Sequence, residues 1–271
     1  MADSTLLSNG RYHVMVTAEG SGYSQWQDMA VTRWREDAAL DDTGSFFFLR
    51  DDDGSEVWSA TARPGGGGRE ATTLSFDAGA VTLSRREHDV AVASTVAVGA
   101  DDDVELRRVR IENLSPRRRR LSLTSYAEIV LSPAATDSAH PAFSKLFVET
   151  AIDASLGAIF ASRRPSATRD GRPWFFHSFS APGAASAGSG ASYETDRMRF
   201  IGRGRSLAEA QALHDAAPLS AHAGPVLDAI ASIRVPLVLE PGASCTVDWF
   251  SGIVASKADA EAMARRCRAV G

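Results

Sequence analysis

The chain has 271 residues, of which 44% are apolar and 23% charged, and its net charge is -5. This composition is ordinary for a folded globular protein and excludes disorder over the whole chain. The negative charge provides no general attraction to nucleic acid or to anionic lipid. Because no stretch of about 18 apolar residues occurs, we expect no membrane-spanning segment in this chain.

The beginning of the sequence and its cysteine content point to a reducing compartment. The residues that follow Met1 lack the charged and apolar regions of a signal peptide. Cys245 and Cys267 are the two cysteines, too few for a disulfide framework in a chain of this length. We therefore expect a cytoplasmic location.

Alternation of apolar with polar residues dominates the sequence and predicts β-strands. In chain order, the predicted strands are Arg11–Ala18, Ser45–Arg50, Glu56–Ala60, Ala80–Arg85, Val90–Val98, Val104–Ile111, Leu121–Leu131, Gly157–Ser162, Pro173–Ser180, Val235–Leu239 and Cys245–Ile253. The apolar residues change parity within Val104–Ile111, which predicts a β-bulge near Arg107 and Arg108. Asp51–Gly54 and the basic run Arg117–Arg120 both predict solvated hairpin turns.

Helix signals are few. A short helix is predicted within Ser206–His214, and Ser256 is a good N-cap for a last helix because Asp259 follows three residues later. Many strands and few helices predict an all-β chain, with two large antiparallel sheets packed as a sandwich. We expect this sandwich over residues 1–254 and a linker helix over residues 255–271.

The histidines, scattered without metal-ligand spacing, predict no metal site. The segment Gly20–Asp37 is richer, because it holds Tyr23, Trp34, Arg33 and Asp37 close together in sequence. Flat aromatic faces and bidentate polar groups suit a carbohydrate. The same residues also fit a structural role, with the tryptophans in the core and Arg33 paired with Asp37.

A family resemblance adds to this interpretation. Seven segments carry it, in order along the chain: Leu6–Thr17, Gly20–Ser24, Val31–Asp37, Thr124–Glu128, Ala139–Phe147, Arg199–Arg205 and Gly224–Asp228. Together they resemble the phosphorylase-like domain of cyclic β-1,2-glucan synthases, within glycoside hydrolase family 94. The resemblance covers nearly the whole chain.

The resemblance implies a galactose-mutarotase-like β-supersandwich that precedes a linker helix and an (α/α)6 barrel. In this family the barrel carries the general acid, and inorganic phosphate attacks the anomeric carbon with inversion. Phosphate is thus a co-substrate of the parent enzyme, and no cofactor is implied. Since the chain stops at Gly271, about where the linker would start, we expect the isolated chain to be inactive and assign it no catalytic residue.

The resemblance also implies partners and contact residues. It implies a β-glucan or gluco-oligosaccharide, the catalytic barrel and a second copy of the chain as partners, and a parent attached to the inner membrane is compatible with it. Loops at Gly20–Ser24 and Asp137–Lys145 would approach the active site. By position, the residues expected nearest to sugar or phosphate are Tyr23, Arg33, Asp37, His140 and Lys145.

Two alternatives remain open from the residues. The chain could act as an autonomous carbohydrate-binding module, which requires affinity for glucans without any catalytic domain. It could also be a mutarotase-type enzyme, which requires a histidine and a carboxylate that converge in a concave site. For the second alternative, the candidates are His88, His177 and Glu128.

Overall fold

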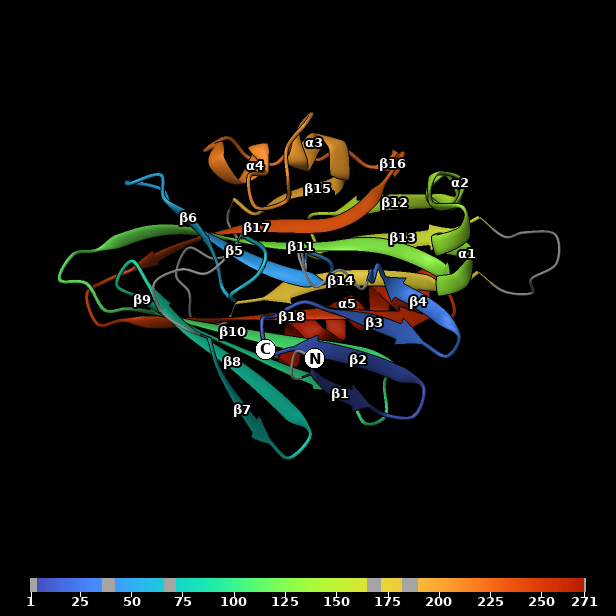
Figure 1. Cartoon of the computed structure of the whole chain (residues 1–271), viewed down its shortest axis with the longest axis horizontal. Helices are drawn as coiled ribbons and strands as arrows, with labels where there is room; N and C mark the ends of the chain where they lie inside the picture. The colour runs from blue at the N-terminus through green and yellow to red at the C-terminus, as the bar shows by residue number, and fades with distance from the viewer. Residues whose placement is uncertain (1–3, 36–41, 66–71, 165–171, 182–189, 271) are drawn as a thin grey trace.

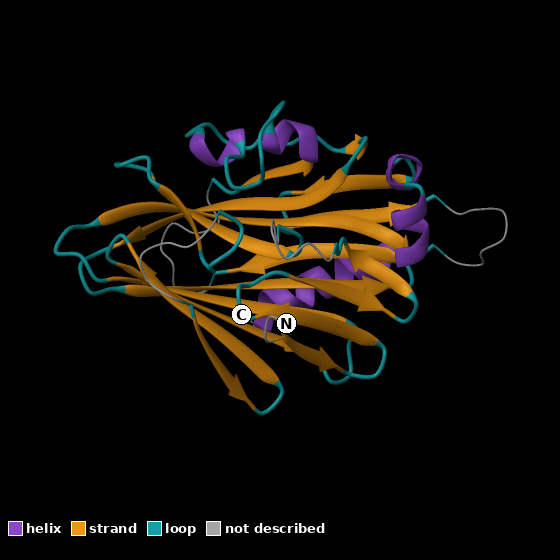
Figure 2. Ribbon diagram, viewed as in Figure 1, coloured by secondary structure: helices purple, strands orange, loops and turns teal. Residues whose placement is uncertain are grey.

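The structure, a computed structural model, describes residues 4–35, 42–65, 72–164, 172–181 and 190–270. Two antiparallel sheets of nine strands each form a sandwich (Figures 1 and 2). The first sheet has the order β1-β2-β3-β4-β11-β17-β15, with β5 paired to β11 and β6 to β5. Its strands are β1 (Ser4–Ser8), β2 (Tyr12–Thr17), β3 (Gly22–Trp26), β4 (Met29–Thr32), β5 (Ser45–Asp51), β6 (Val57–Ser59), β11 (Arg119–Pro133), β15 (Ser192–Asp196) and β17 (Ala229–Leu239).

The second sheet has the order β16-β12-β13-β14-β18-β10-β9-β8-β7. Its strands are β7 (Thr73–Asp77), β8 (Ala80–Glu87), β9 (Val90–Val98), β10 (Val104–Asn113), β12 (Val148–Asp153), β13 (Ala158–Arg163), β14 (Trp174–Ser180), β16 (Gly224–Pro225) and β18 (Ser244–Val254). The prediction of two large antiparallel sheets is confirmed.

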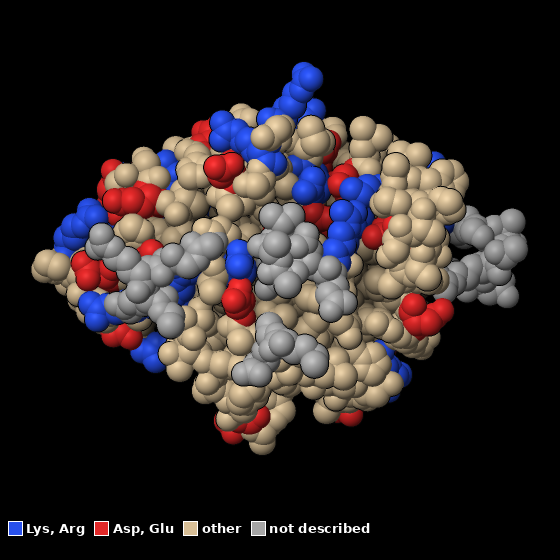
Figure 3. Space-filling view, in the orientation of Figure 1, with Lys and Arg blue, Asp and Glu red and all other residues tan. Residues whose placement is uncertain are grey.

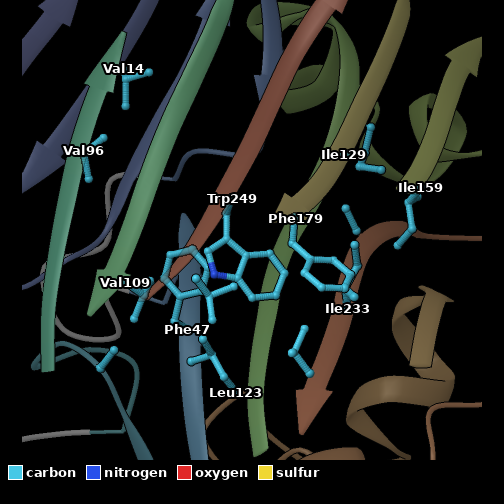
Figure 4. Close-up of a cluster of buried hydrophobic side chains, with 14 of the residues drawn as sticks. Val14, Phe47, Val96, Val109, Leu123, Ile129, Ile159, Phe179, Ile233 and Trp249 are labelled. Atoms are coloured by element: carbon cyan, nitrogen blue, oxygen red, sulfur yellow. The ribbon is translucent and has the colours of Figure 1, made fainter. Parts of the chain in front are cut away.

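The main core fills the space between the sheets (Figure 4). Trp249 of β18 lies at its centre, with the Phe47 ring 5.4 Å away and the Phe179 ring 5.6 Å away, centroid to centroid. Leu123 and Ile233 of the first sheet pack from the opposite side. Strand alternation places these residues inside because every second side chain of a strand points to the same face.

Short helices cover the outer faces. Phe200 of α3 (Arg197–Ile201) and Leu213 of α4 (Gln211–His214) pack on Tyr126 of the first sheet. Helix α5 (Lys257–Val270) covers the second sheet through Ala260 and other small side chains. The amide of Asp259 donates to Ser256 Oγ at 3.2 Å, so the predicted N-cap is confirmed.

Strand β10 has no bulge, so that prediction is wrong. Its register with β9 and β18 is continuous, and Glu105 and Arg107 occupy inward positions together with Val109. The two charged residues form an ion pair of 3.3 Å, and Ser24 Oγ donates to Glu105. Every second residue of β10 thus points inward without interruption, and the inward residues near the start of the strand are charged.

Two loop predictions are also corrected. The segment Asp137–Lys145 folds into parts of α1 (Ala134–Ala139) and α2 (Pro141–Lys145), and Gly22–Ser24 belongs to β3. The basic run 117–120 is only partly solvated. Arg119 is buried, and its guanidinium lies 2.9 Å from the Asp51 carboxylate.

Candidate functional site

A cluster of three cations and three carboxylates lies on the outer face of the first sheet. We call it the charged cluster; it consists of Arg33, Lys145, Arg197, Glu128, Asp137 and Asp228. Its members come from β11, α1, α2, α3 and the segments that follow β4 and precede β17. Segments far apart in sequence therefore meet at one end of the sheet (Figure 1).

Arg33 is the centre of the charged cluster. Its side chain is 2% exposed, and its Nε lies 3.0 Å from Asp137 Oδ2. Its Nη1 lies 3.2 Å from Asp228 Oδ1 and also contacts Glu128. Backbone pairing fixes this position, because the Arg33 amide donates to the Glu128 carbonyl at 3.1 Å.

Two further cations close the network on its exposed side. Lys145 Nζ lies 2.5 Å from Asp228 Oδ2, and Arg197 Nε lies 2.6 Å from Glu128 Oε1. The Tyr126 hydroxyl donates to the same Glu128 oxygen at 3.0 Å. The side chains of Lys145 and Arg197 are 20% and 31% exposed, so these two cations reach the solvent.

Electrostatic interactions within the charged cluster keep Glu128 and Arg33 in their charged forms. Burial alone would raise the pKa of Glu128, but Arg33 and Arg197 outweigh it and lower this pKa to about 2. Burial opposes the charge of Arg33 as well, yet Asp137 and Glu128 raise its pKa. A general acid at neutral pH needs a raised pKa. A carboxyl group with this lowered pKa is ionised at neutral pH, so Glu128 is not suited to act as a general acid there.

Exposed apolar side chains border the charged cluster. Leu146, Met198 and Leu227 are adjacent in sequence to Lys145, Arg197 and Asp228, and their exposures are 46%, 51% and 69%. Phe143, on α2, is 62% exposed. We call these four residues the apolar rim. Figure 3 shows charges of both signs in contact beside a broad uncharged area over α1 and α2.

The structure brings together two of the five predicted contact residues, Arg33 and Lys145, through their shared partner Asp228. Tyr23 lies on β3, half-buried, with its ring centroid 6.0 Å from that of Trp34. His140 is exposed between α1 and α2. Asp37 lies outside the described residues, so its proposed pairing with Arg33 stays a prediction.

Sequence reasoning missed most of the carboxylates of the charged cluster. Asp228 ended a segment that carried the family resemblance and Asp137 began a predicted loop, but nothing in their spacing linked them to Arg33, 195 and 104 residues away. No feature of the sequence predicted that Arg197 belongs to the charged cluster. For Glu128 there was a sequence signal, since its neighbours on the same face of β11 include the buried Tyr126. A carboxylate beside a buried aromatic residue predicts a partner.

The residues considered for a mutarotase-type site do not converge. His177 is buried between the sheets, where its ring nitrogens contact Ser125 Oγ at 2.9 Å and Ser251 Oγ at 2.8 Å. Glu128 lies on the outer face in the charged cluster. His88 lies at the β8–β9 turn in a cavity of about 420 Å³, with its ring centroid 5.0 Å from that of Trp58 and the two rings tilted by 47°.

Over the described ranges, no group of three or more His, Cys, Asp or Glu side chains could hold a metal ion. Within the same ranges, every helix is too short or too polar to cross a bilayer. The two cysteines are free, and burial raises the pKa of each thiol to about 11.

Comparison with known proteins gives the family. The model named "Glycosyl hydrolase 94, supersandwich domain" matches residues 2–270. The chain belongs to this family. It is 38% identical to the cyclic beta-(1,2)-glucan synthase NdvB of Rhizobium meliloti (strain 1021) over 249 residues, which is 92% of this chain and 9% of that protein.

A second relative is the N,N'-diacetylchitobiose phosphorylase of Vibrio proteolyticus, 25% identical over 138 residues. That match covers 49% of this chain and 17% of the phosphorylase. The supersandwich chain therefore spans a small part of both relatives.

Solved structures agree on the fold of the supersandwich. A chain from Escherichia coli K12, named as a candidate aldose 1-epimerase, superposes with a TM-score of 0.56 at 10% identity. The match covers 94% of this chain and all of the other. At this identity it supports the galactose-mutarotase-like fold and carries no argument about activity.

Proposed function

We propose that this supersandwich is a non-catalytic domain of a family 94 glycoside phosphorylase or cyclic β-1,2-glucan synthase. In this proposal the charged cluster and the apolar rim face the catalytic domain and shape its glycan and phosphate site. A β-glucan or gluco-oligosaccharide and inorganic phosphate would be the substrates of the whole protein. A cytoplasmic location and a homodimer are part of the same proposal.

The observation that supports this proposal is that the charged cluster, whose net charge is zero, lies beside the exposed apolar rim. Three cations balance three carboxylates, and the Arg33 side chain is 2% exposed. Exposed apolar side chains that lie beside polar residues can mark a surface that meets another protein domain. Lys145 and Arg197 stay partly exposed, and such cations suit a phosphate group or sugar hydroxyls at the boundary.

A domain exchange tests the proposal. This chain would replace the matching segment of the glucan synthase relative, and glucan synthesis would be measured with and without Leu227→Asp. Since Leu227 is 69% exposed here, the change should leave the fold of the domain intact. A charge forced into the interface should lower the rate about tenfold, equivalent to about 1.4 kcal/mol.

The matched control is Phe76→Asp on β7 of the second sheet, because Phe76 is exposed to a similar extent, 64%. We expect the control to keep the rate of the unmodified exchange protein. Equal rates for both variants would reject the apolar rim as the contact surface.

Autonomous glycan binding is a second candidate, favoured by the aromatic pair of Tyr23 and Trp34. Both side chains are half-buried, and their rings are tilted by 58°. Such rings suit stacking against a sugar face. Calorimetric titration of the isolated chain with β-1,2-linked gluco-oligosaccharides should then show binding that Tyr23→Ala weakens about tenfold, by analogy with aromatic residues at binding hot spots. A flat titration at millimolar sugar would eliminate this function.

A further inference from the structure

A second charged site lies toward the start of β11, on the same outer face of the first sheet. It is a cavity of about 290 Å³, lined by the guanidinium-bearing residues Arg50, Arg120 and Arg234 and by one carboxylate, Asp52. Ser122 completes the part of the lining that comes from β11. The three arginines and one carboxylate give this lining an excess of positive charge.

The register of the sheet explains why two arginines meet here. Arg50 of β5 pairs with Ser122, and Arg234 of β17 pairs with Thr124 on the other side of β11. Leu121 and Leu123 point into the core, so their neighbours in the strand point outward. The two guanidinium groups therefore flank β11 on the same face, although Arg50 and Arg234 are only 7% and 6% exposed.

Within the described part of the chain, no carboxylate forms a direct ion pair with Arg234, although the charges of Asp52 and Asp215 act on it. Among the described residues, its guanidinium donates to the carbonyls of Ala217 at 2.8 Å and Asp215 at 3.1 Å, and also to the Ala212 carbonyl. Burial lowers the pKa of Arg234 and the nearby charge of Arg50 lowers it further, whereas the charges of Asp52 and Asp215 oppose this shift without cancelling it. A buried cation without an ionic partner is costly, because neutral carbonyls do not cancel its charge.

The carboxylates near the other two arginines are already paired with those arginines. Arg50 Nη1 lies 2.6 Å from Asp52 Oδ1, while its buried Nε has no hydrogen-bond partner among the residues that the structure describes. Arg120 lies 2.5 Å from Asp53. Each of these two arginines is thus paired with one carboxylate. The charge of Arg234 remains as the net positive charge of the three arginines and two carboxylates.

We propose that this cavity binds a phosphate group, either as free phosphate or as the phosphate monoester of a sugar. The negative charge of a phosphate group would offset the excess positive charge, and guanidinium groups match its oxygens in bidentate geometry. The cavity has roughly the space of nine or ten water molecules at about 30 Å³ each, which leaves room for a sugar ring beside the phosphate. This site is independent of the charged cluster and of its proposed contact with a catalytic domain.

Titration calorimetry on the whole chain tests the site with inorganic phosphate, glucose 1-phosphate and glucuronate, and with sodium chloride at matched ionic strength. We expect saturable binding of inorganic phosphate, glucose 1-phosphate or both. We expect Arg50→Gln to weaken that binding at least tenfold. Binding of glucuronate alone, or an equal response to sodium chloride, would overturn the phosphate assignment.

A second variant and a control keep the test independent of folding. Arg120→Gln changes a side chain that is 61% exposed, so it should fold normally and weaken phosphate binding several-fold. Arg118→Gln alters an equally exposed arginine outside the cavity and should leave the affinity unchanged. If Arg120→Gln and Arg118→Gln behave alike and Arg50→Gln also retains full affinity, the site is wrong.

Discussion

Replacing Arg33 with methionine is expected to lower the free energy of unfolding by about 3–5 kcal/mol, as found when one partner of a buried ion pair is removed. The change leaves Glu128, Asp137 and Asp228 together, with side-chain exposures of 14%, 10% and 11%. Lys145 and Arg197 cannot balance all three, since among the described residues they pair with Asp228 and Glu128 and leave Asp137 without a cation. Urea denaturation at pH 7 measures the loss.

The pH dependence of this loss separates charge from packing. Glu128 has a folded pKa of about 2, below its ordinary 4.5, so its contribution is complete above pH 4.5 and disappears as the pH falls toward 2. The deficit of Arg33→Met should therefore shrink in acid. Arg118→Met is the matched control, because Arg118 and its partner Glu240 are 61% and 66% exposed, and exposed pairs contribute little. A deficit below about 1 kcal/mol for Arg33→Met would contradict the central role of Arg33.

The fold was predictable from the sequence because period-two alternation is a local signal. Val90–Val98 shows it in consecutive residues, and the structure forms β9 over the same range. The inward Glu105 and Arg107 are the reason that the predicted bulge is wrong, because a buried ion pair breaks the rule that inner positions are apolar. Strand β3 of the other sheet, which supplies Ser24, helps to explain why these charges are tolerated.

The charged cluster was only partly predictable because its contacts join distant segments. Arg33 and Lys145 were expected from the family resemblance, yet their common partner Asp228 lies far from both in sequence. The short helices α1 and α2 were expected to be a loop, since helices of six and five residues have no usable periodicity. Packing against β11, which a single sequence does not display, sets their position.

A second large effect is expected from His177 on acidification. Burial lowers the pKa of His177 to about 3, and the charge of Arg107 adds to this shift. The unfolded chain binds a proton near pH 6.5, whereas the folded protein does not until about pH 3. Stability is therefore unaffected above pH 6.5 and falls as the pH drops below it, by about 1.4 kcal/mol per pH unit.

The variant His177→Gln isolates this effect, because glutamine keeps polar atoms near Ser125 and Ser251 but does not titrate. Its stability at pH 7 is expected to be lower, since the ring stacked on Trp249 at 5.6 Å is lost. Between pH 6.5 and pH 5, however, the parent chain should lose about 2 kcal/mol more than the variant. Guanidinium denaturation at the two pH values measures this difference. Parallel losses would mean that His177 is protonated inside the folded core, and that the sandwich interior admits a charge there.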